Sequence, residues 1–135
     1  GLVGSEMCIR DRRAPGYCQA VLQTWFSEPA EWLADRIEKH QQIRDALLSI
    51  FRAVEGVAVR TPQAGSYLFP RLPPLRTPLK AFIRELRLQA NVTVTPGTEF
   101  SPHAGDSIRL NFSQNHQAAV AGVERIAAMV EKHRL

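Results

Sequence analysis

The run Asp106-Ser107-Ile108-Arg109-Leu110-Asn111-Phe112-Ser113 constrains the fold more than any other part of the chain. Successive side chains of a strand point to opposite faces, so residues two apart share a face. One face of this strand would carry the apolar residues Ile108, Leu110 and Phe112. The other would carry the polar residues Arg109, Asn111 and Ser113. The pattern therefore predicts a strand with one face in a core and a single arginine on its opposite face.

Arg109 is the candidate binding residue of the chain. A guanidinium flanked by small polar groups is well placed to bind a carboxylate through two parallel hydrogen bonds. The alternative is an arginine on a solvated sheet face, because exposed arginines are common. The motifs that precede the strand bear on this choice.

Three motifs follow one another in a fixed order: Gly65-Ser66-Tyr67-Leu68-Phe69, then Pro96-Gly97-Thr98-Glu99-Phe100, then Ile108-Arg109-Leu110. This order resembles the C-terminal small domain of the class I and II aminotransferases, which are fold-type I pyridoxal-phosphate enzymes. The resemblance covers residues 56–135 and extends to the helix before them. It implies that Arg109 binds the α-carboxylate of an amino-acid substrate.

The spacing of apolar residues predicts a helix, two strands, a helix, two strands and a final helix. The expected strands are residues 57–60, 66–69, 92–95 and 107–112, with the first two paired to each other. This order predicts an α+β fold in which a small, mainly antiparallel sheet of about four strands packs against helices. Gly56 is expected to end the first long helix, Thr77 to cap the next with Pro78 in its first turn, and Asn115 to cap the last.

The chain divides into three predicted parts. Residues 1–12 have no helical or strand period and resemble a translated sequencing adapter, so we expect them to be non-native. Residues 13–55 are expected to form a loop and a long helix that link to a missing large domain. Residues 56–135 would be the aminotransferase small domain. We therefore expect an N-terminally truncated piece of a longer protein.

Charge, apolar runs and cysteine content indicate the cellular compartment and the classes of partner to expect. The formal charge is +4, but basic and acidic residues alternate, as in Asp35-Arg36-Ile37-Glu38-Lys39, which is typical of solvated helix faces rather than of a nucleic-acid surface. No apolar run approaches the roughly 20 residues of a membrane span. Cys8 and Cys18 have neither metal-ligand spacing nor the pattern of a disulfide framework. We expect a cytoplasmic protein that binds neither nucleic acid nor membrane and holds no metal.

The resemblance also implies pyridoxal 5'-phosphate as cofactor, an α-amino acid and a 2-keto acid as substrates, and a homodimer at full length. In the family, the lysine that forms an imine with the cofactor lies in the large domain. Lys39, Lys80 and Lys132 lie on helices of mixed charge and are expected at the surface. The chain would then hold no catalytic or cofactor-binding residue, the cofactor would be bound mainly by the missing domain, and the fragment alone would be inactive.

Two other functions stay open. One is the effector-sensing, aminotransferase-like domain of a transcription regulator. The other is a free-standing α+β ligand-binding module, which predicts a monomer with no exposed apolar face. Trp25, Phe26 and Trp32 lie close together in the sequence and suggest packing against something else. Related pyridoxal-phosphate lyases and decarboxylases also fit the residues quoted above.

Overall fold

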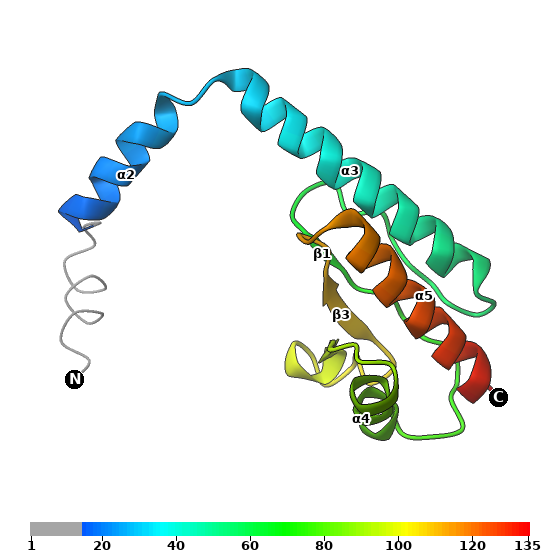
Figure 1. The fold of residues 1–135 in the computed structure, drawn as a ribbon. Helices are drawn as coiled ribbons and strands as arrows, with labels where there is room; N and C mark the ends of the chain where they lie inside the picture. Colours follow the sequence, from blue (N-terminus) through cyan, green and yellow to red (C-terminus); the bar gives the residue numbers. More distant parts are fainter. Residues whose placement is uncertain (1–14) are drawn as a thin grey trace. The chain divides into compact units, whose positions relative to one another are not determined.

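The structure is a computed structural model that describes residues 15–135, so the predicted non-native segment, residues 1–12, lies outside the described residues. The chain divides into two compact units between Arg36 and Ile37. The elements in chain order are α2 (Gly16–Phe26), α3 (Ala30–Ala53), β1 (Tyr67–Leu68), α4 (Leu79–Gln89), β2 (Thr95–Pro96), the 3-10 helix η1 (Gly97–Glu99), β3 (Ile108–Asn111) and α5 (His116–His133) (Figure 1).

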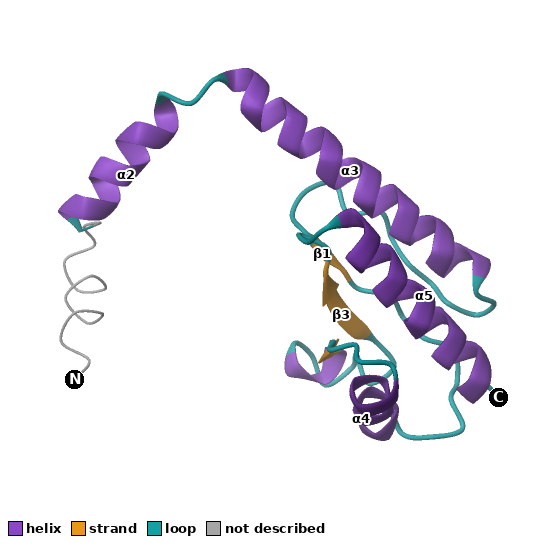
Figure 2. Ribbon diagram, viewed as in Figure 1, coloured by secondary structure: helices purple, strands orange, loops and turns teal. Residues whose placement is uncertain are grey.

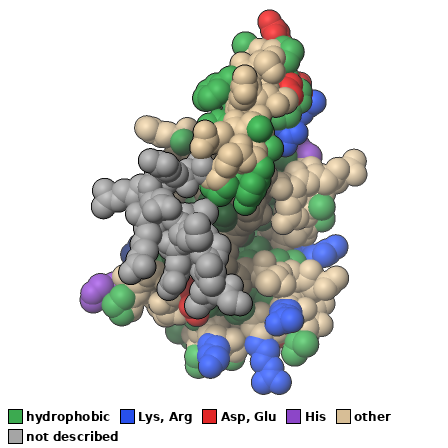
Figure 3. All heavy atoms as spheres, turned by 90° about the vertical axis from the view of Figure 1, so that its left-hand side faces the viewer, with side chains coloured by type: hydrophobic (Ala, Val, Ile, Leu, Met, Phe, Trp, Pro, Cys, Tyr) green, Lys and Arg blue, Asp and Glu red, His purple; other side chains and the backbone are tan. Residues whose placement is uncertain are grey.

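The first unit exposes much apolar surface. Helix α2 contains no charged residue, and none of its residues is buried. Its Phe26 side chain is 79% exposed and Tyr17 is 75% exposed. Trp25 and Trp32 meet edge to face, with ring centroids 5.7 Å apart, yet both remain exposed. Hydrophobic side chains are accordingly visible on the surface in Figure 3. A free-standing module predicts no exposed apolar face, so this surface weighs against that alternative.

The second unit holds a small antiparallel sheet. Its strand order is β1-β3-β2, so the strand that carries Arg109 lies in the middle (Figure 2). Tyr67 pairs with Asn111 and Leu68 with Leu110, while Thr95 lies opposite Arg109. The α+β class with helices against an antiparallel sheet is confirmed, with three strands in place of the expected four.

The predicted pairing of residues 57–60 with residues 66–69 is wrong. Ala58 instead forms a single bridge with Arg71, through backbone hydrogen bonds of 3.0 and 2.9 Å. Pro62 has no N–H to donate, and Gly65 turns the chain with a φ of +79°. Pro62 and Gly65 both lie between residues 57–60 and residues 66–69. Residues 57–60 therefore contact the chain beyond Phe69, at Arg71. The residues that were expected to pair with 57–60 pair with β3.

One hydrophobic core holds the second unit together. It joins the C-terminal half of α3, helix α4, the buried face of the sheet and helix α5. Its fully buried side chains include Leu47, Phe51, Phe82, Leu86, Ile108, Phe112, Val123, Ile126 and Val130. Helices α4 and α5 each pack inward through one stripe of apolar residues at the helical spacing. Within residues 15–135, no helix combines the length and the apolar character that crossing a membrane requires.

The predicted helix ends are correct at two of three places. Gly56 follows α3 with a φ of +80°, and a Cβ on it would lie 2.8 Å from Cβ of Pro73, so a larger residue fits poorly. Asn115 caps α5, as expected. The predicted cap at Thr77 is wrong. Pro78 has an extended ψ of 144°, so Pro78 itself is the N-cap residue and the helix begins at Leu79.

Candidate functional site

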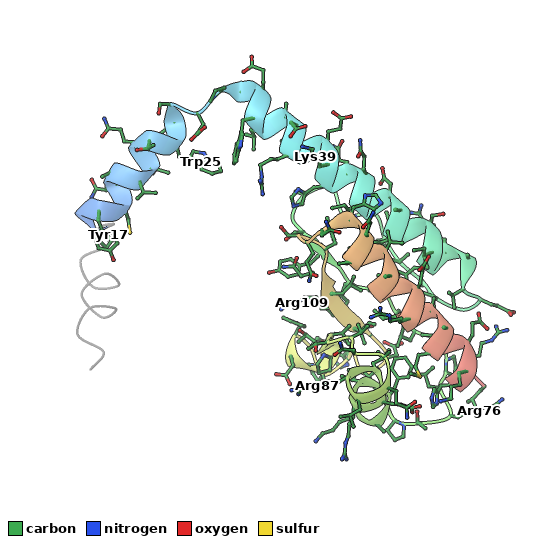
Figure 4. All side chains as sticks on the ribbon, in the orientation of Figure 1. Tyr17, Trp25, Lys39, Arg76, Arg87 and Arg109 are labelled. Carbon is green, nitrogen blue, oxygen red and sulfur yellow. The ribbon has the colours of Figure 1, made fainter. Side chains whose placement is uncertain are left out.

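Arg109 lies on the outer face of the central strand. Its neighbours Ile108 and Leu110 are 0% and 8% exposed, whereas Arg109 is half-buried and Asn111 is exposed. The alternation predicted for this strand is therefore confirmed. Because Thr95 lies directly opposite Arg109 in the neighbouring strand, a hydroxyl shares this face with the guanidinium. Figure 4 shows Arg109 beside the strands of the sheet.

Two aromatic rings contact the guanidinium of Arg109. Its Cζ atom lies 4.7 Å from the ring centroid of Tyr67 and 4.4 Å from that of Phe100. Tyr67 belongs to β1, and Phe100 follows β2 and η1, so each neighbour of the central strand supplies one ring. The sequence alone indicated both residues only as parts of motifs, and it did not predict their contact with Arg109. The alternation of Tyr67 with the buried Leu68 is the signal that could have placed Tyr67 on the face of Arg109.

A cavity of about 440 Å³ opens beside this face. The residues that line it come from β1, β3, the segment that leads into β2 with Thr95 of β2 itself, Gln114, and residues 118–126 of α5. Its polar lining consists of Tyr67, Asn91, Thr93, Thr95, Arg109, Asn111, Gln114 and Arg125. Neither a carboxylate nor a lysine is among the described residues around the cavity. The charged groups there are two guanidinium groups, so the lining suits an anionic ligand.

Arg109 differs from the arginines that form ion pairs. Arg44 Nε lies 2.8 Å from Asp45, and Arg134 pairs with Glu55 and Glu131. The hydrogen bond from Arg44 lowers the pKa of the Asp45 carboxyl, which is the expected effect of a neighbouring cation. Within residues 15–135, no such carboxylate lies within ion-pair distance of Arg109. The N–H donors of Arg109 therefore form no ion pair with a carboxylate of the described residues.

The lysines lie elsewhere. Lys39 on α3, Lys80 on α4 and Lys132 on α5 are all exposed, and none lines the cavity next to Arg109. Lys132 Nζ donates to Glu85 Oε1 over 2.9 Å, so this ammonium has a carboxylate partner. In the part of the chain that the structure describes, no group of three or more His, Cys, Asp and Glu residues is placed to hold a metal ion.

Comparison with known proteins places the chain in a family. The sequence pattern of the family described as "Aminotransferase class I and II" matches residues 3–126. An aspartate aminotransferase from Musicola paradisiaca is 26% identical over 102 residues, which are 75% of this chain and 26% of that protein.

Solved structures of aminotransferases are also similar to this chain. An aspartate aminotransferase from Rhodobacter sphaeroides is 59% identical with a TM-score of 0.89, over 97% of this chain and 33% of that one. The aspartate aminotransferase from Rhizobium meliloti shares the fold at 24% identity, with a TM-score of 0.68 over 79% of this chain and 29% of its own. The chain thus spans about a third or less of the length of each of these proteins. It belongs to the class I and II aminotransferase family.

Proposed function

We propose that this chain is the substrate-binding C-terminal part of a pyridoxal-phosphate-dependent aminotransferase, which transfers an amino group between an α-amino acid and a 2-keto acid. In this proposal Arg109 binds the α-carboxylate of the substrate. The observation that carries it is the half-buried guanidinium of Arg109, which lines a cavity without an acidic lining and has no carboxylate partner among the described residues. Two parallel N–H···O bonds would fix the carboxylate and thereby orient the amino group.

The cofactor does not fit the residues that this chain offers. Pyridoxal phosphate needs a lysine for imine formation, and no lysine lies among the described residues around the cavity. Lys132 forms an ion pair with Glu85 and is not among the residues that line the cavity. We infer that the complete protein binds the cofactor mainly through its large domain. The chain itself would contribute the substrate clamp, and the complete protein would be a cytoplasmic homodimer.

The chain alone should therefore form no specific imine. We expect that pyridoxal phosphate and borohydride leave Lys39, Lys80 and Lys132 without a stoichiometric adduct, as read by peptide mass spectrometry. The same preparation should show no transaminase activity. A stoichiometric adduct on one of these lysines would contradict the division of roles between the two domains.

A chimera tests the clamp. The chain would replace the aligned third of the Rhodobacter sphaeroides enzyme, which is 59% identical to it. The assay compares L-aspartate with β-alanine, which lacks the α-carboxylate, using a 2-keto acid as acceptor. Arg109→Lys keeps the charge but loses the bidentate fork. Because a hydrogen bond to a charged group contributes about 1.5–3 kcal/mol, kcat/KM for L-aspartate should fall about tenfold to a hundredfold.

Two controls accompany this test: the activity toward β-alanine and the binding of the cofactor. Arg109→Lys should change kcat/KM for β-alanine much less, and Arg109→Ala should impair L-aspartate further. The absorbance of bound pyridoxal phosphate should stay near that of the parent chimera. If L-aspartate and β-alanine are affected equally, or if neither is affected, Arg109 is not the carboxylate clamp.

A further inference from the structure

The two rings on Arg109 occupy positions that core packing does not explain. Tyr67 is 48% exposed and Phe100 is 51% exposed, so neither ring is enclosed by the hydrophobic core. Their contacts with the guanidinium, at 4.7 and 4.4 Å from the ring centroids, lie within the range of cation–π interactions. These rings therefore have a specific partner on the surface of the sheet.

The backbone fixes where both rings stand. Tyr67 lies on β1 in register with Asn111, two residues beyond Arg109 on the same face. Phe100 is the C-cap residue of η1, and its N–H donates to the Gly97 carbonyl over 2.9 Å. The ring of Phe69 packs edge to face on that of Phe100, with centroids 5.8 Å apart, and supports it from the side. Both rings that contact Arg109 are therefore held in place, Tyr67 by strand pairing and Phe100 by a backbone hydrogen bond and a ring contact.

Stacking and hydrogen bonding use different parts of a guanidinium. The five N–H donors lie in its plane, whereas an aromatic ring is attracted to the cation over the ring face. Rings that hold the group against the sheet therefore leave N–H donors for a carboxylate. A guanidinium already held in one orientation also loses less rotational freedom when it binds.

We propose that Tyr67 and Phe100 are positioning residues that hold the Arg109 guanidinium in the orientation that receives the substrate carboxylate. The inference rests on the proposed function, since it assigns the aromatic pair to the same site. It gives a further reason to expect that lysine is a poor substitute at this position, because an ammonium lacks the planar fork that the rings orient.

The test uses the 135-residue chain with ¹⁵N-labelled arginine and acetate as the carboxylate probe. Loss of one Nε–Hε signal in Arg109→Lys assigns the resonance. Tyr67→Leu and Phe100→Leu remove one ring each, whereas Tyr67→Phe and Phe100→Tyr retain it. We expect each leucine variant to shift the Arg109 Hε signal, through loss of the ring current. Acetate affinity should weaken by about twofold to fivefold per ring, the fold-change that matches an exposed cation–π contact.

The ring-retaining variants should keep both the signal position and the affinity. If the leucine variants leave both unchanged while Arg109→Lys abolishes acetate binding, the positioning role is wrong and the clamp stands. If Arg109→Lys binds acetate as well as the parent chain does, the clamp itself is wrong. These two failures are therefore distinguishable.

A measurement on the unmodified chain covers the case in which a leucine variant does not fold. The ¹⁵N relaxation of Arg109 Nε is compared with that of Arg87, an exposed arginine in the last turn of α4. We expect Arg109 Nε to be clearly more ordered on the picosecond-to-nanosecond timescale. Equal mobility of the two side chains would overturn the proposal without any substitution.

Discussion

The backbone N–H of Gly97 donates to the carbonyl of Ser107 over 2.7 Å, and this bond ties the Pro-Gly turn to the residue that precedes β3. Gly97 is buried, and a Cβ placed on it would collide with the carbonyl oxygen of Ala104 and lie 2.8 Å from that of Ser107. The turn therefore needs a residue without a side chain. Phe100, which contacts Arg109, follows three residues later, so the same close approach helps to shape the candidate site.

Gly97→Ala should destabilise the chain. Backbone atoms, which cannot rotate away as a side chain could, block the added methyl group. Overpacking of this kind costs about 1–3 kcal/mol, and the free energy of unfolding from urea titration followed by circular dichroism would measure it. Gly105→Ala is the matched control, because nothing lies within 4 Å of a Cβ there. It should stay within about 0.5 kcal/mol of the parent. Equal effects at both glycines would contradict the steric argument.

A third glycine should respond with the opposite sign. Gly122 lies inside α5, and a Cβ built on it meets nothing within 4 Å. Alanine loses less backbone freedom on folding than glycine does, so Gly122→Ala should raise the free energy of unfolding by about 0.5–1 kcal/mol. The same urea titration measures it. A loss of stability would show that this face of α5 is more closely packed than the structure indicates.

The strand that carries Arg109 was predictable because its apolar and polar residues alternate without interruption. The stripes of α4 and α5 and the Asn115 cap were predictable for similar reasons, since each depends on neighbours in the sequence. The partner of residues 57–60 was not, because strand pairing is a choice between distant segments. Ala58 pairs with Arg71, thirteen residues away, in place of the nearer segment that contains Tyr67.

The surroundings of Arg109 were predictable only in part. The arginine could be placed on a polar face, and its motifs indicated the family. The contact with Phe100 depends on how the chain turns in η1 after β2. The spacing of apolar and polar residues in the sequence does not predict the conformation of that turn. The misplacement of the Thr77 cap has a local cause. Proline is compatible with both the N-cap and the first helical position, and its ψ of 144° decides for the former.

Asn115→Ala should weaken the last helix. The Asn115 Oδ1 atom accepts hydrogen bonds from the backbone N–H groups of Gln117 at 3.0 Å and Ala118 at 3.3 Å. Loss of such a cap costs about 1 kcal/mol, and the urea midpoint should fall accordingly. Asn115→Asp retains the acceptor and adds a negative charge at the helix N-terminus, so it should remain close to the parent. If aspartate destabilises the chain as much as alanine does, the cap is not the reason.

The acid sensitivity of the fold should depend on Glu85, which joins α4 to the end of α5. Its Oε1 accepts from Lys132 Nζ at 2.9 Å, and its Oε2 lies 3.0 Å from His133 Nε2, outside hydrogen-bonding geometry. The hydrogen bond from Lys132 is the main reason why the pKa of Glu85 is lowered. Partial burial opposes this shift, and the contact with His133 adds to it.

The sign of the effect follows from linkage. A carboxyl whose pKa is lower in the folded chain releases its proton more readily there, so its contribution to stability is present above the ordinary pKa of 4.5. That contribution is lost as the pH falls from there through the lowered pKa of the folded chain. Glu85→Gln should therefore be less stable than the parent at neutral pH, and the difference should shrink at acid pH.

Urea midpoints measured from about pH 7 down to about pH 3 would test this linkage. Other carboxyl groups titrate over the same range, so the informative quantity is the difference between parent and variant at each pH. Lys132→Met removes the main cause of the shift and should reduce the pH-dependent part of that difference, whereas a general effect of substitution would not. A difference between parent and Glu85→Gln that stays constant down to acid pH would show that Glu85 does not link folding to proton uptake.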